Sequence, residues 1–121
     1  MNQQATDPTK TEMANCCVDV FDVPLLRALC EPSRIEILRE LVKKGPADIK
    51  AIAQDLPQDR SVISRHLKVL EEAHIIRSRK DGRHVRYEID GPTFADQFEA
   101  MGEFVRNLAP ICCPTDDQSC C

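Results

Sequence analysis

The chain has 121 residues, of which 42% are hydrophobic and 30% charged, and its formal net charge is −4. This length fits one small domain, and four Phe, one Tyr and no Trp leave a mostly aliphatic core. No apolar run approaches the roughly 20 residues of a membrane span, and the N-terminus has no signal-peptide core. The composition therefore predicts a soluble, cytoplasmic protein with no membrane partner.

The N-terminal half predicts a flexible tail and three short helices. Residues 1–17 are polar and aperiodic except for Cys16-Cys17 at their end, and a first helix is expected over about Val20–Leu29. Pro32 suits the first turn of a second helix, which Gly45-Pro46 ends, and a third helix is expected over Ala47–Leu56. The side chains expected to face the core are Leu25, Leu26 and Leu29 in the first helix, Ile35, Leu38 and Leu41 or Val42 in the second, and Ile49, Ile52, Ala53 and Leu56 in the third.

A fourth helix with two contrasting faces is predicted after Pro57-Gln58. Asp59 is a favourable N-cap, and its side chain is expected to bond the first-turn N–H groups. Ile63, Leu67 and Leu70 follow at helical spacing and form an apolar stripe. The opposite face has hydroxyls and cations without a carboxylate, a surface suited to base edges and phosphates in a DNA major groove. Its residues are Arg60, Ser61, Ser64, Arg65 and Lys68.

A basic β-hairpin is predicted next. Val85, Tyr87 and Ile89 alternate with polar residues, and Asp81-Gly82 is a strong signal for a two-residue type I′ turn. The hairpin contains the cations Arg77, Arg79, Lys80, Arg83 and Arg86. A basic hairpin directly after a helix that fits a groove indicates the wing of a winged helix-turn-helix.

The distribution of charge supports binding to DNA in spite of the negative total. Residues 58–86 contain eight Lys and Arg against four Asp and Glu, a net charge of +4, and the remaining residues carry −8. A run of charge is often no more than a solvated face. Here the positive segment coincides with the predicted helix and wing, which favours a nucleic-acid surface.

The last predicted helix follows the break at Gly91-Pro92 and is expected to stop at Pro110. Its apolar residues recur at nearly heptad spacing, which fits either a core helix packed on its own domain or a dimerisation helix. Because the helix is surplus to a three-helix-plus-wing unit, we favour dimerisation. The expected organisation is a tail over residues 1–17, a winged helix-turn-helix domain with its dimerisation helix over 18–110, and a cysteine-rich tail over 111–121. The apolar seam consists of Phe94, Phe98, Met101, Val105 and Leu108.

Two segments at their proper separation resemble the ArsR/SmtB family of metal-responsive repressors. The sequence Leu29–Leu38 is similar to that family's second-helix signature, and Ser61–Ala73 with the following Asp-Gly-Arg wing resembles its recognition helix and wing. The resemblance covers roughly residues 20–110. It implies a mainly α fold with a small β-hairpin, N- and C-terminal dimerisation helices, a homodimer, and double-stranded operator DNA as the partner.

Six of the seven cysteines form adjacent pairs outside the predicted winged-helix core. Thiolates select soft ions, and As(III) or Sb(III) takes three sulfurs, so a vicinal pair plus one more cysteine suffices. The C-terminal cysteines could close such a site alone, and their pattern resembles the C-terminal cysteines of some arsenic repressors. The expected ligands are Cys16, Cys17, Cys112, Cys113, Cys120 and Cys121, whereas Cys30 is expected to be a buried structural residue.

Which cysteines share one site stays open, as does the inducer. The N-terminal pair resembles that of another branch of the family, whose third sulfur comes from the third helix, but Ala47–Leu56 contains no cysteine. As(III) or Sb(III) is favoured as inducer, without an organic cofactor. A soft divalent ion such as Cd, Pb or Zn and thiol-redox or persulfide sensing are the alternatives. A thiol reductase is disfavoured because no Cys-x-x-Cys or phosphate-binding loop is present, so no enzyme activity is expected.

Overall fold

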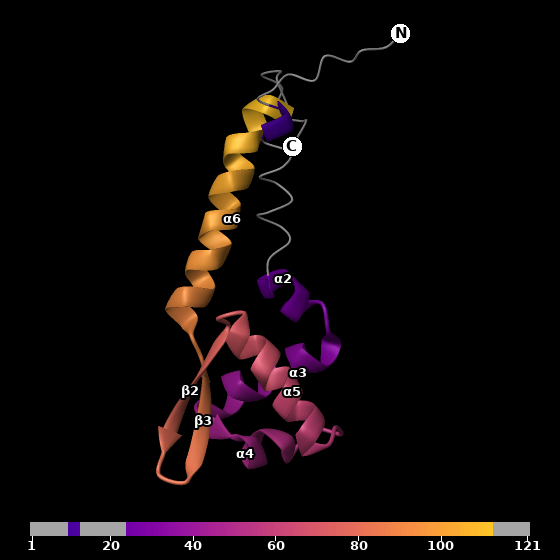
Figure 1. Cartoon of the computed structure of the whole chain (residues 1–121), viewed down its shortest axis with the longest axis vertical. Coiled ribbons are helices and arrows are strands. Elements are labelled where there is room, and N and C mark those ends of the chain that lie inside the picture. The colour runs from indigo at the N-terminus through magenta and orange to yellow at the C-terminus, as the bar shows by residue number, and fades with distance from the viewer. Residues whose placement is uncertain (1–9, 13–23, 113–121) are drawn as a thin grey trace. The chain divides into compact units, whose positions relative to one another are not determined.

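The computed structural model describes residues 10–12 and 24–112, and of residues 109–112 only the backbone. The chain divides into two compact units, of which one is Val23–Gln97 and the other contains Met1–Asp22 and Phe98–Cys121. Residues 10–12 are helical. The remaining elements are α2 (Pro24–Leu29), α3 (Pro32–Lys44), β1 (Ala47–Asp48), α4 (Ile49–Ala53), α5 (Arg60–Glu72), β2 (Ile76–Asp81), β3 (His84–Ile89) and α6 (Gly91–Cys112) (Figure 1).

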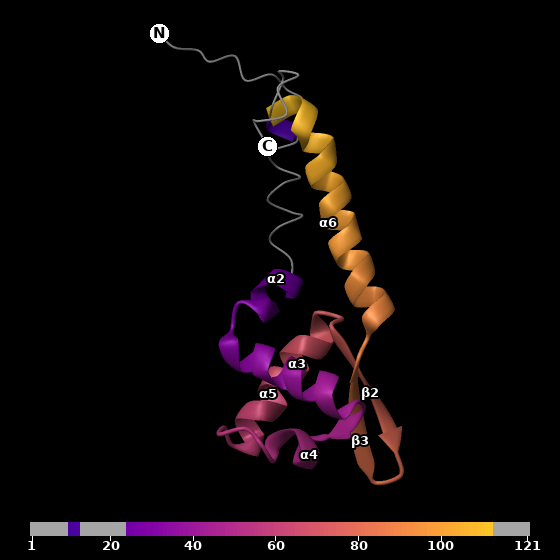
Figure 2. The same ribbon diagram turned by 180° about the vertical axis from the view of Figure 1, so that it is seen from behind.

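The unit Val23–Gln97 is a helix-turn-helix with a β-sheet at one side (Figures 1 and 2). Its core is aliphatic, as the composition predicts, and it lies where α2, α3 and α4 meet α5 and the start of β2. The predicted apolar stripe of α5 is confirmed, because Ile63, Leu67 and Leu70 are all fully buried. The other buried apolar residues are Leu25, Ala28, Ile37, Leu38, Leu41, Ala47, Ile52, Ala73, Ile75 and Ile76.

The buried face of α3 differs from the predicted one. Ile35 is exposed, so its assignment to the core is wrong, and of the alternatives Leu41 and Val42 it is Leu41 that is buried, whereas Val42 is 72% exposed. The helix buries the predicted Leu38 and Leu41 and, in addition, Ile37 and Glu40. Glu40 can lie on the buried face because two lysines in the last turn of α3 neutralise its carboxylate.

The segment predicted as one third helix is a strand followed by a shorter helix. Ala47 and Asp48 form β1, and α4 begins at Ile49 and ends at Ala53. Asp48 explains the boundary, since its Oδ1 accepts a hydrogen bond of 2.8 Å from the N–H of Ala51 and caps α4. Of the predicted core residues here, Ile52 is buried, whereas Ala53 and Leu56 are half-buried.

The wing is a three-stranded antiparallel sheet with the strand order β1-β3-β2, rather than a two-stranded hairpin. The β2–β3 hairpin was predicted, but its turn differs from the prediction. Asp81 pairs with His84, so the two-residue loop is Gly82-Arg83. Among the described loop residues, positive φ occurs at Gly82 (65°) and not at Arg83, which is typical of type II′ rather than type I′.

The helix α6 runs from Gly91 through Pro110 to Cys112, so Pro110 does not end it. The missing N–H of this proline forfeits a single bond within the helix, and the backbone continues for two more residues. Along the predicted seam, Phe98 and Val105 are exposed, while Phe94, Met101 and Leu108 are half-buried. No helix in the described ranges is long and apolar enough to cross a membrane.

Candidate nucleic-acid interface

The helix α5 is fixed at the start by its backbone and along its length by its apolar face. Asp59 occupies the N-cap position, and its carbonyl accepts from the N–H of Ile63 at 3.0 Å. Its side chain makes no capping bond, so the expected side-chain cap is wrong. Because Ile63, Leu67 and Leu70 are held in the core, the opposite face of α5 must point outward.

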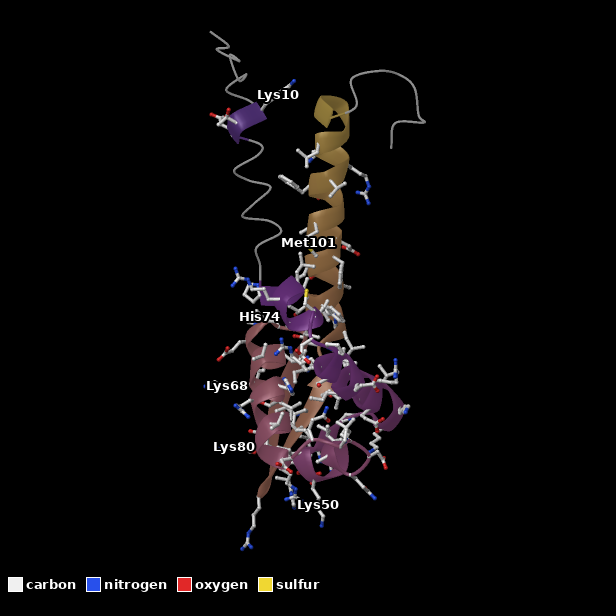
Figure 3. All side chains as sticks on the ribbon, turned by 90° about the vertical axis from the view of Figure 1, so that its right-hand side faces the viewer. Lys10, Lys50, Lys68, His74, Lys80 and Met101 are labelled. Carbon is white, nitrogen blue, oxygen red and sulfur yellow. The ribbon has the colours of Figure 1, made fainter. Side chains whose placement is uncertain are left out.

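That outward face is the predicted surface of hydroxyls and cations. Arg60, Ser61, Ser64, Arg65 and Lys68 are all exposed, and Lys68 extends from α5 in Figure 3. Within residues 24–112, none of these three cations has a carboxylate partner at ion-pair distance. The face therefore keeps its positive charge and its hydrogen-bond donors available for a polyanion.

His66 lies beside this face without adding to its charge. The side chain is half-buried, and desolvation, helped by the nearby Arg34 guanidinium, lowers the pKa of its imidazole. A lowered pKa keeps His66 neutral at neutral pH. This agrees with its position next to the apolar stripe of α5.

A lysine at the end of α3 positions the helix α4. Lys44 Nζ donates to the carbonyl of Ala51 at 2.7 Å and pairs with Asp55 Oδ2 at 2.9 Å and Glu40 Oε2 at 3.3 Å. The hydrogen bond that Lys44 donates to Asp55 raises the pKa of Lys44, whereas the hydrogen bond that Glu40 accepts from Lys43 at 3.1 Å lowers the pKa of Glu40. This network holds the turn that precedes α5. In the sequence, Lys43 and Lys44 follow Glu40 at the i+3 and i+4 positions, a spacing that predicts their ion pairs but that the periodicity of apolar residues does not reveal.

Charged side chains of both signs form a ladder of cross-strand pairs on the outer face of the wing. The cross-strand partners on this face are Arg77 with Glu88, Arg79 with Arg86, and Asp81 with His84. Glu88 Oε1 accepts from Arg77 at 2.8 Å and from Arg79 at 3.0 Å, and Asp81 pairs with Arg86 at 3.0 Å. Arginines and carboxylates of the two strands thus form ion pairs on one face of the β2–β3 hairpin.

The four predicted DNA-contacting cations of the wing do not share one face. Arg79 and Arg86 belong to the outer ladder, Lys80 lies opposite Val85 on the other face of the hairpin, and Arg83 lies in the turn. His84 Nδ1 lies 3.4 Å from Asp48 Oδ2 and links the start of β3 to β1. The wing therefore presents cations on two faces and at its tip.

The structure describes few of the cysteines. Cys16, Cys17, Cys113, Cys120 and Cys121 lie outside the described residues, and of Cys112 the backbone alone is described, at the end of α6. Cys30 is exposed, so its assignment as a buried structural residue is wrong. It lies in the turn between α2 and α3, whereas the buried residues of α2 are Leu25 and Ala28. In the ranges 10–12 and 24–112, no group of three or more His, Cys, Asp or Glu side chains could hold a metal ion.

Three helices, a recognition-type helix with an exposed cationic face and a β-wing define a winged helix-turn-helix DNA-binding protein. The fold matches the homodimeric winged helix-turn-helix DNA-binding domain Mb0332 of Mycobacterium bovis, solved in solution, with a TM-score of 0.54 at 21% identity, over 89% of this chain and 91% of that one. A family model described as HVO_A0114 matches residues 29–91, which is just over half of the chain.

Closer relatives are transcriptional regulators. The chain is 33% identical to a possible transcriptional regulator for arsenical resistance of known crystal structure, with a TM-score of 0.57, covering 72% of this chain and 95% of that one. It is 28% identical over 113 residues to the arsenical resistance operon repressor of Escherichia coli K12, covering 84% of this chain and 97% of the repressor. The chain belongs to the ArsR family of winged helix-turn-helix transcriptional regulators. This is a family of regulators and not of enzymes.

Proposed function

We propose that the protein is a homodimeric repressor that binds double-stranded operator DNA through α5 and the wing. The observation that carries this proposal is the outward face of α5, where hydroxyls and cations stand exposed without a paired carboxylate. Such a face can donate to base edges and phosphates in the major groove. The proposed DNA contacts are Arg60, Ser61, Ser64, Arg65 and Lys68 on α5 and Arg79, Lys80, Arg83 and Arg86 on the wing.

The proposed dimer forms through α6. Val105 is 48% exposed on this helix, and Met101 and Leu108 are half-buried on the same seam, which leaves apolar area for a second copy to cover. The relative Mb0332 is a homodimer. Two-fold symmetry would present two α5 helices to the two halves of a pseudo-palindromic operator, about one helical turn apart.

The proposed inducer is As(III) or Sb(III), bound by three sulfurs from the vicinal cysteines. The candidates are the pairs Cys16-Cys17, Cys112-Cys113 and Cys120-Cys121. Two of the relatives are named for arsenical resistance, which supports a thiophilic metalloid over the alternatives of a soft divalent ion or thiol oxidation. A protein of this function works in the cytoplasm, where thiols stay reduced.

Binding of the metalloid releases DNA if it favours an arrangement of the dimer in which the two α5 helices no longer match the operator. Coupling between two such sites is typically about 1–3 kcal/mol, enough to shift a promoter from mostly occupied to mostly free. Reciprocity requires that operator DNA weaken binding of the metalloid by the same factor.

A gel-shift experiment tests this function. The reduced full chain is mixed with a duplex from its own upstream region, with and without arsenite, with Cd²⁺, and with peroxide or a persulfide donor. We expect a shifted band that arsenite abolishes. No shift at low salt would refute DNA binding, and release by Cd²⁺ or oxidant but not by arsenite would refute the metalloid.

Two cysteine variants locate the sensing site. Replacement of Cys112 and Cys113 by Ser should leave DNA binding intact and abolish release by arsenite. The matched control is the double replacement of Cys16 and Cys17. If release survives the first change and fails in the second, the site lies at the N-terminal pair instead.

A further inference from the structure

Two arginines stand directly opposite each other on the outer face of the wing. Arg79 of β2 and Arg86 of β3 are cross-strand partners, which places their Cβ atoms about 5 Å apart. Like charges at this position destabilise a sheet. An arrangement that is unfavourable in the free protein needs either local compensation or a ligand that uses both charges.

Local compensation is present but partial. Arg79 Nη2 donates to Glu88 Oε1, which also accepts from Arg77, and Arg86 Nε donates to Asp81 Oδ2. Each arginine is thus held by a carboxylate of the opposite strand, at one end of its guanidinium group. Since a guanidinium has five N–H donors, both groups keep several donors for another acceptor.

The two carboxylates differ in how firmly they hold. The Glu88 side chain is 17% exposed and is tied by two arginines, so it is a rigid anchor, whereas Asp81 is 65% exposed. Surface pairs such as Asp81–Arg86 contribute little to stability. The two carboxylates instead orient the arginine side chains. Glu88 draws Arg79 toward one end of the ladder and Asp81 draws Arg86 toward the other, which separates the two guanidinium groups.

A hollow lies at these two arginines. It has a volume of about 370 Å³ and is lined by Pro46, Arg79, Lys80, Asp81 and Arg86. Two guanidinium groups at one hollow match the two free oxygens of a phosphodiester. The wing follows α5 in a segment of net charge +4, which favours a phosphate of duplex DNA over a free anion.

We propose that Arg79 and Arg86 together clamp one phosphate of the DNA backbone, and that Glu88 and Asp81 are positioning residues that hold the two guanidinium groups on either side of it. Lys80 also lines the hollow, but in the register of the hairpin it belongs to the opposite face, and Arg83 lies in the turn, so neither is part of the opposed pair. The inference rests on the proposed DNA-binding function and adds which wing cations act as a pair.

The test is a double-mutant cycle measured by fluorescence anisotropy on the upstream duplex, with Arg79→Ala, Arg86→Ala and the double variant. Each single change should weaken binding about tenfold. The double change should weaken it about twentyfold, clearly less than the roughly hundredfold product of two independent effects. The matched control is the cycle of Lys80→Ala and Arg83→Ala, for which the effects should multiply. Multiplying effects for Arg79 and Arg86 as well would overturn the clamp.

Neutral methylphosphonates placed one at a time along the duplex identify the phosphate. At one position per half-site, the substitution should remove the effect of both Arg79→Ala and Arg86→Ala. Different positions for the two arginines would overturn the clamp. Failure of the wild-type protein to bind the unmodified duplex would instead refute the proposed function itself.

The positioning role of Glu88 has its own readout. Glu88→Gln removes a negative charge, so a purely electrostatic role predicts tighter binding with the Arg79–Arg86 coupling retained. A positioning role predicts that the coupling disappears, so that the two alanine effects multiply in the Glu88→Gln background. Retained coupling would overturn this part of the inference.

Discussion

Arg65 and Lys68 show how burial on one side of a helix determines exposure on the other. The apolar stripe of α5 is fully buried, and the charged residues between its members are therefore turned to solvent. Arg39 on α3 is exposed too, but Glu36 binds it at 2.7 Å. An arginine without such a carboxylate partner in the described unit loses less on binding a phosphate or a base.

We expect Arg65→Ala to weaken operator binding by about 1–3 kcal/mol, the value of a good contact between arginine and a base. Anisotropy titrations on cognate and scrambled duplexes measure it, with Arg39→Ala as a control of equal charge change. A loss that is equal on both duplexes would assign Arg65 to the phosphate backbone. An unchanged affinity would remove Arg65 from the interface.

Glu40 is a buried carboxylate whose negative charge pairs with Lys43 and Lys44. Its side chain is 7% exposed, and the hydrogen bond from Lys43 lowers the pKa of the carboxyl below 4.5. The folded state therefore binds the proton more weakly than the unfolded state. The contribution of the ionised Glu40 to stability is complete above the pKa of the unfolded state and is lost as the pH falls through the lower pKa of the folded state.

We therefore expect Glu40→Gln to lower the free energy of unfolding at pH 7. Below pH 4.5, the difference in free energy of unfolding between the variant and the wild type should narrow. Urea titrations of both proteins at pH 7 and at acidic pH measure this. The control is Glu36→Gln, an exposed α3 carboxylate that pairs with Arg39. A difference from the wild type that stays constant with pH would contradict the linkage.

The helices were predictable from sequence to the extent that their periodicity was unambiguous. In α5, apolar residues occur on one side only, and the buried set follows directly from them. In α3, apolar residues cover a broad face of the helix, so periodicity could not separate buried Ile37 from exposed Ile35. The buried face includes Glu40, whose partner Lys44 also bonds Ala51 and Asp55, and these contacts outside α3 are a tertiary effect that periodicity does not show.

Only those strands of the sheet that are adjacent in sequence were predictable. The β2–β3 hairpin is adjacent in sequence and was predicted, whereas β1 pairs Ala47 with Tyr87 across forty residues. A two-residue strand has no periodicity of its own to detect. The Arg79–Arg86 opposition was missed for a similar reason, because it depends on the register, which the Gly82-Arg83 loop sets.

Gly82 offers a test of that loop. Its φ of 65° is a conformation that side chains rarely adopt, so we expect Gly82→Ala to destabilise the protein by about 1 kcal/mol. Gly102 is the matched control, since it lies within α6, and an added Cβ would meet Arg106 Nη2 at 3.7 Å, an ordinary contact. Gly102→Ala should therefore stabilise α6 by up to about 1 kcal/mol. Thermal unfolding followed by circular dichroism measures both, and equal signs would contradict the argument.

At the scale of the whole molecule, the proposed function needs two copies of the chain. One winged helix contacts half an operator, whereas two linked copies convert the second contact into an intramolecular event. The seam of α6 offers exposed apolar area for this purpose, and its near-heptad spacing was visible in the sequence. The sequence could not show which α6 residues stay exposed on a single copy.

Val105→Glu tests this requirement. A carboxylate in the middle of an apolar seam would be buried without a partner in the dimer, so we expect the protein to become monomeric at micromolar concentration. Operator affinity should then fall by on the order of 100-fold, because the gain from linking two copies is lost. Sedimentation equilibrium and anisotropy measure the two effects. The exposed Glu103 supplies the control, as Glu103→Gln on the same helix should alter neither. A variant that remains dimeric would place the interface elsewhere, and a monomer that keeps full affinity would show that one winged helix suffices for the operator.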